Sequence, residues 1–515
     1  MPMSGRRERS ERGPMRASRR AALVRCTLCA LCTLCTMTGS LAAAAGDGDR
    51  LLQAVKRGDA RVVRAVLAQF SGKTLANASD PDGTTVLHWA VHRADVEIVD
   101  ELLAAGARVD AANRFGVRPL SLAAADGQAA IVARLLRRGA DANTSLNGES
   151  ALMLAARAGS EAAVTPLLDA GADPNATEGW REQTALMWAA AEGHAVVVRT
   201  LLARGAHVRA RSKLGFTALL FAVRQGEIEA ARALLDGGAD VNDVLMGIGG
   251  ATTAGSGPAR AEAGITAFLL AAANAHYELA TLLLERGADP NAAPRGWTAL
   301  HQVSWVRKAG IAGSNDPAPA GSGSIDSLQF VRTLVARGAN VNARVTTKPP
   351  VGVTRLNMIG ATPFLLAART ADAEYMQLLG ELGADTQATN EDGSTALMVA
   401  AGLGTAAPGE DPGTEPEVLE AVKVALALGG DPNAVDRNGD TVMHGAASKH
   451  GPSVVRFLAE AGATIDVWNR KNKDGHTPLD ITVGVQRGMN ILSSPPTAAA
   501  VAEVMARAGV TPPRK

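Results

Sequence analysis

The sequence predicts an all-α repeat solenoid, in which short helix–turn–helix units stack on one another. A threonine begins unit after unit. From Thr85 to Thr217 the successive units begin 33, 32, 34 and 33 residues apart. Arg118 in one unit and Ser150 in another take the place of the threonine. A Gly-Ala-Asp type sequence, as at residues 139–141, follows about twenty residues later in each unit. Two markers in phase at a fixed period are the signature of a repeat architecture.

Residues 183–213 show how one unit is expected to fold. Apolar residues such as Val198 and Leu201 recur at helical spacing. Each helix has only about ten residues and is too short to be stable alone in water, so its apolar side must pack against the next unit. The alanines at 189–191 keep the first helix thin. We expect Gly205, just past the second helix, to adopt a left-handed backbone conformation.

The opening of the units resembles that of the ankyrin repeat family. Residues 85–90 read Thr-Val-Leu-His-Trp-Ala and residues 298–301 read Thr-Ala-Leu-His, although only three units carry the proline that the family has in the second position. The resemblance extends over roughly residues 47–510. It implies stacked helix–turn–helix ankyrin repeats with short β-hairpin fingers between them.

Composition and spacing divide the chain into five parts. Residues 1–45 are predicted to be a signal peptide and residues 46–81 an N-terminal capping repeat, whose polar outer face suits the end of a solenoid. Residues 82–243 are regular repeats, and residues 244–497 are repeats with loop insertions. Residues 498–515 are a capping helix and a tail.

The insertions are recognised where the 33-residue step is exceeded by Gly-, Pro- and Ser-rich sequence, which predicts loops. Two are expected in fingers and three between the helices of one unit. Long loops in compact repeats usually have a use, so we expect them to cover repeat edges or to close over a partner. They are residues 244–262, 344–357, 308–324, 402–415 and 484–497.

The N-terminal segment has the pattern of an export signal. A basic stretch, Arg6 to Arg25, is followed by apolar residues 28–37 and by small residues that suggest cleavage near Ala45. The chain is therefore interpreted as an exported, bacterial-type ankyrin repeat protein, periplasmic or secreted. The alternative is a retained anchor over residues 27–45, which would tether the protein to the membrane. The true start, Met1 or Met15, is left open.

Charge and cysteine usage limit the partners. Removing eight arginines and two glutamates with residues 1–45 leaves 44 basic and 49 acidic residues, a net charge near −5, which argues against nucleic acid. All four cysteines lie in that segment, so the remaining chain must be stabilised by repeat packing alone, and we expect a monomer without cofactors or metal ions.

No pattern typical of a catalytic site is found, and the chain is not predicted to be an enzyme. His88, His301 and His444 share one repeat position, and the family resemblance implies that they hydrogen-bond within the turn. Residues 410–417 form an acidic stretch interrupted by prolines, which we interpret as a solvated loop rather than as a Ca²⁺ loop.

Two groups of residues are candidates for binding a protein partner. Tryptophans beside the inserts are common interface anchors. The polar residues that end the first helices would line the concave face that solenoids use for partners. The candidates are Trp297, Trp305 and Trp468, and then Arg93, Asp126, Arg157, Glu192, Gln225, Asn274 and Arg369.

The sequence therefore predicts a non-enzymatic scaffold for protein–protein interaction, exported from the cytoplasm, that binds its partner through the concave face and the C-terminal insert loops. A membrane-tethered scaffold is the alternative. An enzyme with a site built from the insert loops is the least favoured interpretation.

Overall fold

The computed structural model of the protein describes residues 46–69, 74–246, 264–308, 319–349, 354–409, 411–487 and 490–511. The predicted signal peptide, residues 1–45, lies outside them. The chain divides into two units at His207 and Val208. Unit 1 is the described part of Met1–His207, and unit 2 is the described part of Val208–Lys515. The predicted part boundaries group repeats by their inserts rather than by contacts, and they stay predictions.

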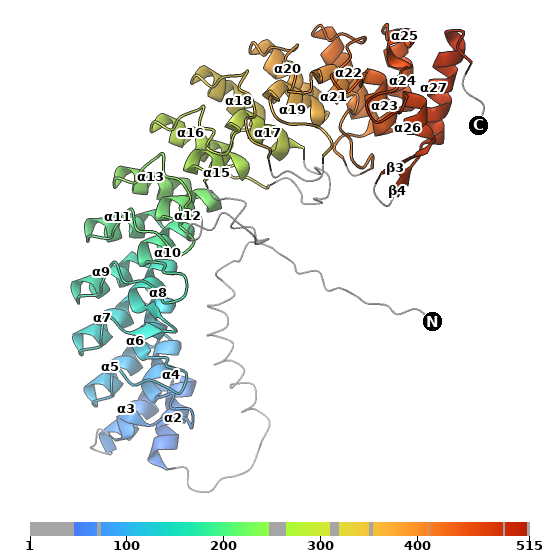
Figure 1. Ribbon diagram of the computed structural model, residues 1–515. Helices are drawn as coiled ribbons and strands as arrows, with labels where there is room; N and C mark the ends of the chain where they lie inside the picture. The colour runs from blue at the N-terminus through green and yellow to red at the C-terminus, as the bar shows by residue number, and fades with distance from the viewer. Residues whose placement is uncertain are drawn as a thin grey trace, which may run out of the picture. The chain divides into compact units, whose positions relative to one another are not determined.

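Unit 1 contains five helix pairs. The first helices pack against one another in one row and the second helices pack in a parallel row, as the blue to green part of Figure 1 shows. The pairs are α2 (Asp47–Arg57) and α3 (Ala60–Gln69), α4 (Val86–His92) and α5 (Val96–Ala104), α6 (Pro119–Ala125) and α7 (Ala129–Arg137), α8 (Ala151–Arg157) and α9 (Glu161–Asp169), and α10 (Ala185–Ala191) and α11 (Ala195–Ala203). A 3₁₀ turn, η1 (Leu75–Asn77), precedes α4.

Unit 2 repeats this arrangement seven times. The pairs are α12 (Ala218–Gln225) and α13 (Ile228–Asp236), α15 (Ala267–Ala273) and α16 (Tyr277–Glu285), α17 (Ala299–Arg307) and α18 (Ser327–Ala336), α19 (Pro363–Arg369) and α20 (Ala373–Glu381), α21 (Ala396–Ala400) and α22 (Glu415–Ala427), α23 (Val442–Lys449) and α24 (Pro452–Glu460), and α26 (Pro478–Gly484) and α27 (Pro495–Arg507). The short helix α25 (Ile465–Trp468) lies between the last two pairs. The predicted all-α repeat solenoid is confirmed.

Where the repeated threonine begins a first helix, it stands at the N-cap of that helix. Thr85 is extended at the N-cap of α4, and its side chain forms a capping box with His88. The His88 Nδ1 lies 2.7 Å from the Thr85 hydroxyl, and Nε2 lies 2.9 Å from the Val117 carbonyl oxygen of the next repeat. His301 and His444 form the same box and bond to carbonyls of the following repeats. The predicted hydrogen-bonding role of these histidines is confirmed, and each also ties two repeats together.

The core lies between the helix rows and consists mainly of small and branched aliphatic side chains. In α11, Val197, Val198 and Leu201 are buried, as their helical spacing predicts. The alanines of α10 let the first helices of neighbouring repeats approach closely. Gly205 has φ = 86°, so its expected left-handed conformation is confirmed.

Asparagine side chains add hydrogen bonds between successive repeats. In unit 1, Asn143 donates to the Gly171 carbonyl at 3.0 Å and accepts from the Asp173 amide at 2.9 Å. In unit 2, Asn433 bonds to Gly462 and Thr464 in the same way. Each side chain satisfies a carbonyl at the end of a second helix that the helix itself leaves unpaired.

The fingers are tight turns with little strand. In the described residues of the fingers, one hairpin qualifies as a sheet, with β1 (Ser145–Leu146) antiparallel to β2 (Glu149–Ser150). Isolated bridges join Ser79 to Thr85 and Val244 to Thr266.

The described parts of the inserts lie in fingers or between the two helices of a pair, where the spacing predicts them. One insert differs from the expected loop. Residues 484–497 contain a second hairpin, β3 (Val485–Arg487) paired with β4 (Asn490–Leu492), and α27 begins at Pro495, three residues before the predicted start. Proline is tolerated in the first turn of a helix because its missing N–H would be unpaired there. Within the described residues, no helix is both long and apolar enough to span a membrane.

Candidate functional site

The predicted helix-end residues of unit 1 occupy the ends of successive first helices. Arg93, Asp126 and Glu192 are the C-cap residues of α4, α6 and α10, and Arg157 is the last residue of α8. Arg93 and Glu192 are exposed, and Asp126 is half-buried. Because the first helices pack side by side, these four positions form one row, and their predicted role in binding a partner stays a prediction.

Arg157 is the most constrained member of this row. Its Nη1 lies 3.1 Å from a Glu149 carboxylate oxygen, and its guanidinium lies 5.1 Å from the centre of the Trp188 ring. Its carbonyl oxygen lies 3.0 Å from the His194 Nε2. Arg93, by contrast, donates its Nη1 to the Lys56 carbonyl at 3.2 Å and keeps an exposed side chain. Arg93 and Glu192 are therefore the members best placed to meet a partner.

In unit 2, the equivalent residues have diverged. Gln225 is exposed at the end of α12, and Asn274 is half-buried at the end of α15, where it donates to the Leu270 carbonyl. Arg369, at the end of α19, is only 8% exposed, and its Nη2 donates to the Asp411 carboxylate at 3.0 Å. Arg369 is thus engaged inside the protein and offers little surface to a partner.

The three candidate tryptophans also differ in what they expose. Trp468 is 1% exposed, and its Nε1 donates to the Ala463 carbonyl at 3.3 Å, so it belongs to the core of the last repeats. Trp297 is 7% exposed and stacks edge-on against the half-buried Trp305, with ring centres 5.8 Å apart. Trp305 is the one with most access to solvent, and the partner-binding role of all three stays a prediction.

The acidic stretch after α21 is not a solvated loop at Asp411, and that interpretation was wrong. The Asp411 side chain is fully buried. It accepts from Arg369 through one oxygen and from the Ala406 amide, at 2.7 Å, through the other. Lys449, at the end of α23, donates to the Asp411 and Pro412 carbonyls, at 2.8 Å each. Burial lowers the pKa of the Lys449 amine to about 8. Spacing along the chain could not show that two buried cations of other repeats face this loop.

The insert between α17 and α18 also returns to the repeats. The Ser322 hydroxyl lies 2.9 Å from the Nδ1 of His276 and 3.3 Å from the Gly226 carbonyl oxygen, both in turns of preceding repeats. At its start, Lys308 pairs with Glu417 at 2.7 Å, and this bond holds the pKa of the Glu417 carboxyl at about 2. The described ends of this insert therefore cover inter-helix turns, which was one of the two roles expected for the inserts.

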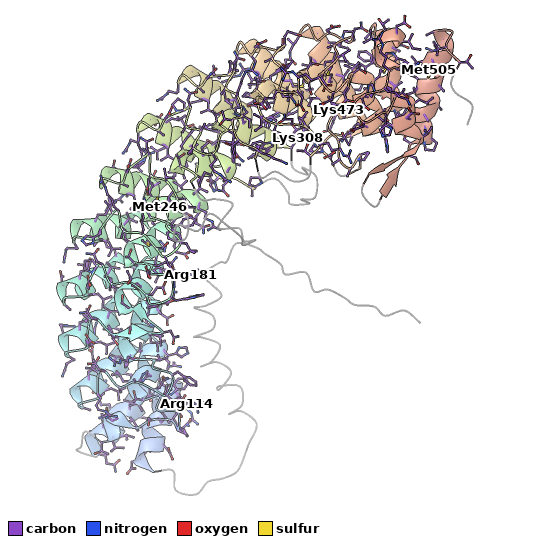
Figure 2. All side chains as sticks on the ribbon, viewed as in Figure 1. Arg114, Arg181, Met246, Lys308, Lys473 and Met505 are labelled. Atoms are coloured by element: carbon purple, nitrogen blue, oxygen red, sulfur yellow. The ribbon has the colours of Figure 1, made fainter. Side chains whose placement is uncertain are left out.

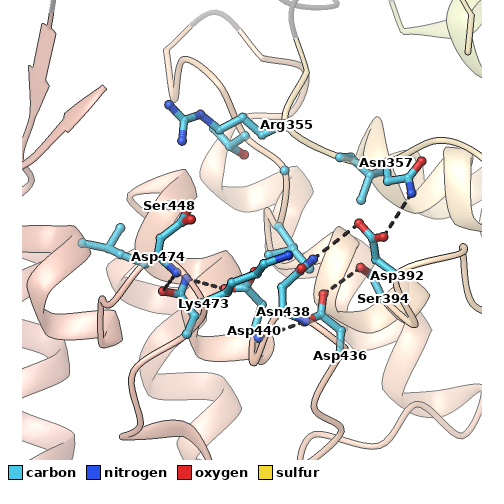
Figure 3. A pocket seen from close by; sticks show the side chains of 16 residues that line it. Arg355, Asn357, Asp392, Ser394, Asp436, Asn438, Asp440, Ser448, Lys473 and Asp474 are labelled. Atoms are coloured by element: carbon cyan, nitrogen blue, oxygen red, sulfur yellow. Dashed lines mark hydrogen bonds between the residues drawn. The ribbon is translucent and has the colours of Figure 1, made fainter. Parts of the chain in front are cut away.

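The finger insert between α18 and α19 roofs a cavity of about 400 Å³ in unit 2. The Arg355 amide donates to the Gly404 carbonyl at 3.1 Å, and Leu356 is buried beside it. Figure 3 shows Arg355 at one side of this cavity and the fingers of the next repeats at the other. The described end of the insert thus packs onto the neighbouring repeats and lines part of this cavity.

The polar groups of this cavity are largely bonded to one another. Asp436 is buried and accepts from the Ser394 hydroxyl at 2.9 Å and from two amides of its own finger. Asp392 accepts from Asn357 at 3.1 Å and from Asn438 at 3.4 Å (Figure 3). The carboxylates therefore organise the fingers, and within the described residues no group of three or more His, Cys, Asp or Glu side chains could hold a metal ion.

Unit 1 exposes two aromatic side chains at finger tips, which sequence reasoning missed. Phe115 is 52% exposed and Trp180 is 59% exposed. Each carries a neighbouring arginine, Arg114 with its guanidinium 4.7 Å from the Phe115 ring and Arg181 with its guanidinium 4.3 Å from the Trp180 ring. Figure 2 shows Arg114 and Arg181 on the side of the first helices. We call these two fingers, residues 113–117 and 178–183, the aromatic fingers.

The aromatic fingers share a sequence feature with other fingers of the chain. Arg-Phe-Gly at residues 114–116 and Gly-Trp-Arg at residues 179–181 place an aromatic residue in a turn between repeats. This pattern does not by itself indicate exposure, because Phe216 and Trp297 also stand beside a glycine in fingers and are only 2% and 7% exposed.

Comparison with known families agrees with this geometry. A family model described as ankyrin repeats in three copies matches residues 95–178 and 152–244, and one described as ankyrin repeats in many copies matches residues 268–305. Residues 95–244 and 268–305 of the chain therefore match ankyrin repeats. The rows of first and second helices and the fingers are the parts of ankyrin repeats that the sequence resemblance implied.

Similarity to individual proteins is confined to part of each chain. NF-kappa-B inhibitor delta of Mus musculus is 28% identical over 186 residues, 36% of this chain and 50% of that protein. Ankyrin repeat and SOCS box protein 16 of Mus musculus is 36% identical over 119 residues, 23% and 24% of the two chains. Palmitoyltransferase AKR1 of Lachancea kluyveri is 29% identical over 199 residues, 36% and 26%.

The chain therefore spans at most about half the length of these ankyrin relatives. All three are eukaryotic, so they do not support the bacterial-type assignment. One carries the name of an enzyme, whereas ankyrin repeats themselves are typically non-catalytic interaction modules.

Proposed function

We propose that this ankyrin-repeat chain is a non-catalytic scaffold that is exported and binds a protein partner. The observation that supports it best is the row formed by Arg93, Asp126, Arg157 and Glu192 in unit 1. Polar side chains repeat there at the C-terminal ends of neighbouring first helices. A solenoid offers such a row as an extended binding surface.

Within this row, exposure decides which residues contribute most. Arg93 and Glu192 are exposed and carry full charges, whereas Arg157 is held by Glu149 and Trp188. The partner-binding surface is therefore centred on the first-helix side of unit 1. Trp305 and the cavity of unit 2 are two further candidates, each near inserts that the sequence favoured.

Export is proposed from the N-terminal sequence alone. Its basic stretch, apolar core and small residues near Ala45 follow the order of a cleaved signal. The protein is then periplasmic or secreted. A retained segment would instead tether the same scaffold to the membrane. Sequencing the N-terminus of the protein from its native host separates the two: a start near residue 46 supports cleavage, and a start at Met1 or Met15 supports the anchor.

The binding role is tested by affinity capture from the native extracytoplasmic fraction with the full chain as bait. The double variant Arg93→Ala, Glu192→Ala is compared with Arg199→Ala, Glu161→Ala, which removes the same charge types from exposed second helices of unit 1. We expect the first variant to lose its captured partner and the second to keep it. Equal capture by both would place the binding surface elsewhere.

A further inference from the structure

We propose that the two aromatic fingers of unit 1 bind an extended acidic protein segment whose carboxylates lie about six residues apart. The proposal rests on the scaffold function above and adds the chemistry of the partner. It starts from Phe115 and Trp180, two of the five large hydrophobic side chains that are exposed in the described residues. An exposed aromatic with an arginine beside it is the composition typical of interface hot spots.

Both tips are held rigid from below by a buried polar side chain. The Asn113 Oδ1 accepts from the Phe115 and Val117 amides at 3.0 Å, and its amide donates to the Thr84 hydroxyl at 3.1 Å. Asn113 is 8% exposed, so these bonds are shielded from water. A preorganised tip loses little conformational freedom when a partner binds.

Glu178 has the same role two repeats later. It is 4% exposed, and its carboxylate accepts from the amides of Trp180 at 2.7 Å, Arg181 at 2.6 Å and Gln183 at 3.3 Å. Its charge is therefore used within the finger. The Arg181 guanidinium lies on the Trp180 ring instead.

The arginines of these fingers differ in their contacts from four other arginines of unit 1. Arg64, Arg134, Arg157 and Arg204 each pair with a carboxylate. Within the described part of the chain, Arg114 and Arg181 show ring contacts and no ion pair. A guanidinium stacked on a ring keeps its N–H edge available for a bidentate bond to a carboxylate, so the complementary ligand is acidic.

The geometry sets the spacing in that ligand. One repeat separates the aromatic fingers, and packed helices lie roughly 8–10 Å apart, so the tips are roughly 20 Å apart. An extended chain rises about 3.3 Å per residue and crosses this distance in about six residues. The finger between them ends in Asn147 and Gly148, which carry no bulky side chain and leave the path open.

The test uses fluorescence anisotropy with the full chain and a blocked, labelled peptide. The peptide carries two Glu-Leu pairs on a Gly/Ser linker, with the glutamates six residues apart. We expect saturable binding, and roughly tenfold weaker binding for Arg114→Gln and again for Arg181→Gln, because each removes one charge-assisted pair. Arg137→Gln, on an exposed position of α7, is the matched control and should bind as the parent does. Circular dichroism and melting confirm that each variant is folded.

Three further probes separate the alternatives. The same peptide with glutamine for glutamate, and one with the glutamates two residues apart, should each bind at least tenfold more weakly. A single-stranded oligothymidine of twelve nucleotides should not compete with the acidic peptide.

Absent binding, equal binding of the glutamine peptide, or unchanged binding by the double variant Arg114→Gln, Arg181→Gln would overturn the proposal. Tighter, arginine-dependent binding of the oligonucleotide would replace it with a nucleic-acid surface. If a captured native partner depends on Arg93 and Glu192 but not on Arg114 and Arg181, the scaffold function stands and this inference fails.

Discussion

The two units differ in how far they expose the charged and aromatic side chains considered for partner binding. In unit 1, the bare repeats leave Phe115 and Trp180 exposed, with arginines that make no ion pair in the described residues. In unit 2, insert residues fold back, and Arg369 meets the buried Asp411 while Trp468 lies in the core. The difference shows that an insert in a repeat stack can bury a charged side chain that would otherwise be available to a partner.

This comparison changes where partner binding is expected. The inserts seemed to locate function in the C-terminal half, because long loops usually have a use. Their described ends cover turns, roof a cavity and neutralise cations, so a large part of that use is structural. The regular repeats keep the charges and rings that a partner could contact.

The sharpest contrast is between two tryptophans. We expect Trp468→Ala to lower the free energy of unfolding of unit 2 by about 3–5 kcal/mol, because it empties a buried site. Trp180→Ala should change the free energy of unfolding of unit 1 by no more than about 0.5 kcal/mol, since the ring is largely exposed. Urea unfolding of both variants measures the difference. Similar losses for the two would show that Trp180 packs as a core residue.

The next largest effect concerns the charge cluster around Asp411. Asp411→Ala leaves Arg369 and Lys449 buried without their carboxylate, which should cost about 3–5 kcal/mol. Hydrogen exchange should show the loss in α19 to α23 and leave unit 1 unchanged. Glu420→Ala, which breaks an exposed pair with Lys423, is the control, with an expected change below about 1 kcal/mol. An unaffected Asp411→Ala variant would mean that the cluster does not hold the insert.

Acidification should destabilise unit 2 more than unit 1. Burial lowers the pKa of His301 to about 4, and it also lowers the pKa of His276 and His444, whereas the described part of unit 1 has one such histidine, His88. The unfolded chain binds these protons at higher pH than the folded chain. The stabilisation is therefore complete above about pH 6.5 and is lost as pH falls toward 4.

For His301 the loss is about 3 kcal/mol, from a difference of roughly two and a half pKa units. Unfolding followed between pH 7 and pH 4 should show it, and a His301→Gln variant should have a flatter profile over this range. A steeper loss in unit 1 would contradict the comparison.

The smallest expected effect is that of deleting residues 308–324. The deletion removes a partly buried pair, Lys308 with Glu417, and the Ser322 bonds to His276 and Gly226. We therefore expect the free energy of unfolding to fall by about 1–2 kcal/mol. Lys308→Ala should lose less than about 1 kcal/mol.

The same deletion also tests partner binding. The sequence predicts that the deletion weakens partner binding. If the partner binds at unit 2, Trp305→Ala should weaken binding as well. Captured partner that survives both changes but is lost with Arg93→Ala, Glu192→Ala would assign binding to unit 1.

Much of the ankyrin architecture was predictable because it is local. The threonine that caps each first helix, the glycine after each second helix and the helical spacing of the apolar residues act within one repeat. Their period alone therefore predicted the helix pairs and the fingers. It also placed Arg93 and its equivalents at helix ends, since position within a helix follows from the same period.

Tertiary structure decided what each of those residues contacts. Arg369 and Asp411 are 42 residues apart, and only folding of the insert brings them together in a buried pair. The exposure of Trp180 and the burial of Trp468 likewise depend on which neighbours cover each ring. Periodicity specifies the repeat, because its signals lie within one unit. Burial and charge pairing are set by contacts between repeats of the stack, and no pattern within a single repeat encodes them.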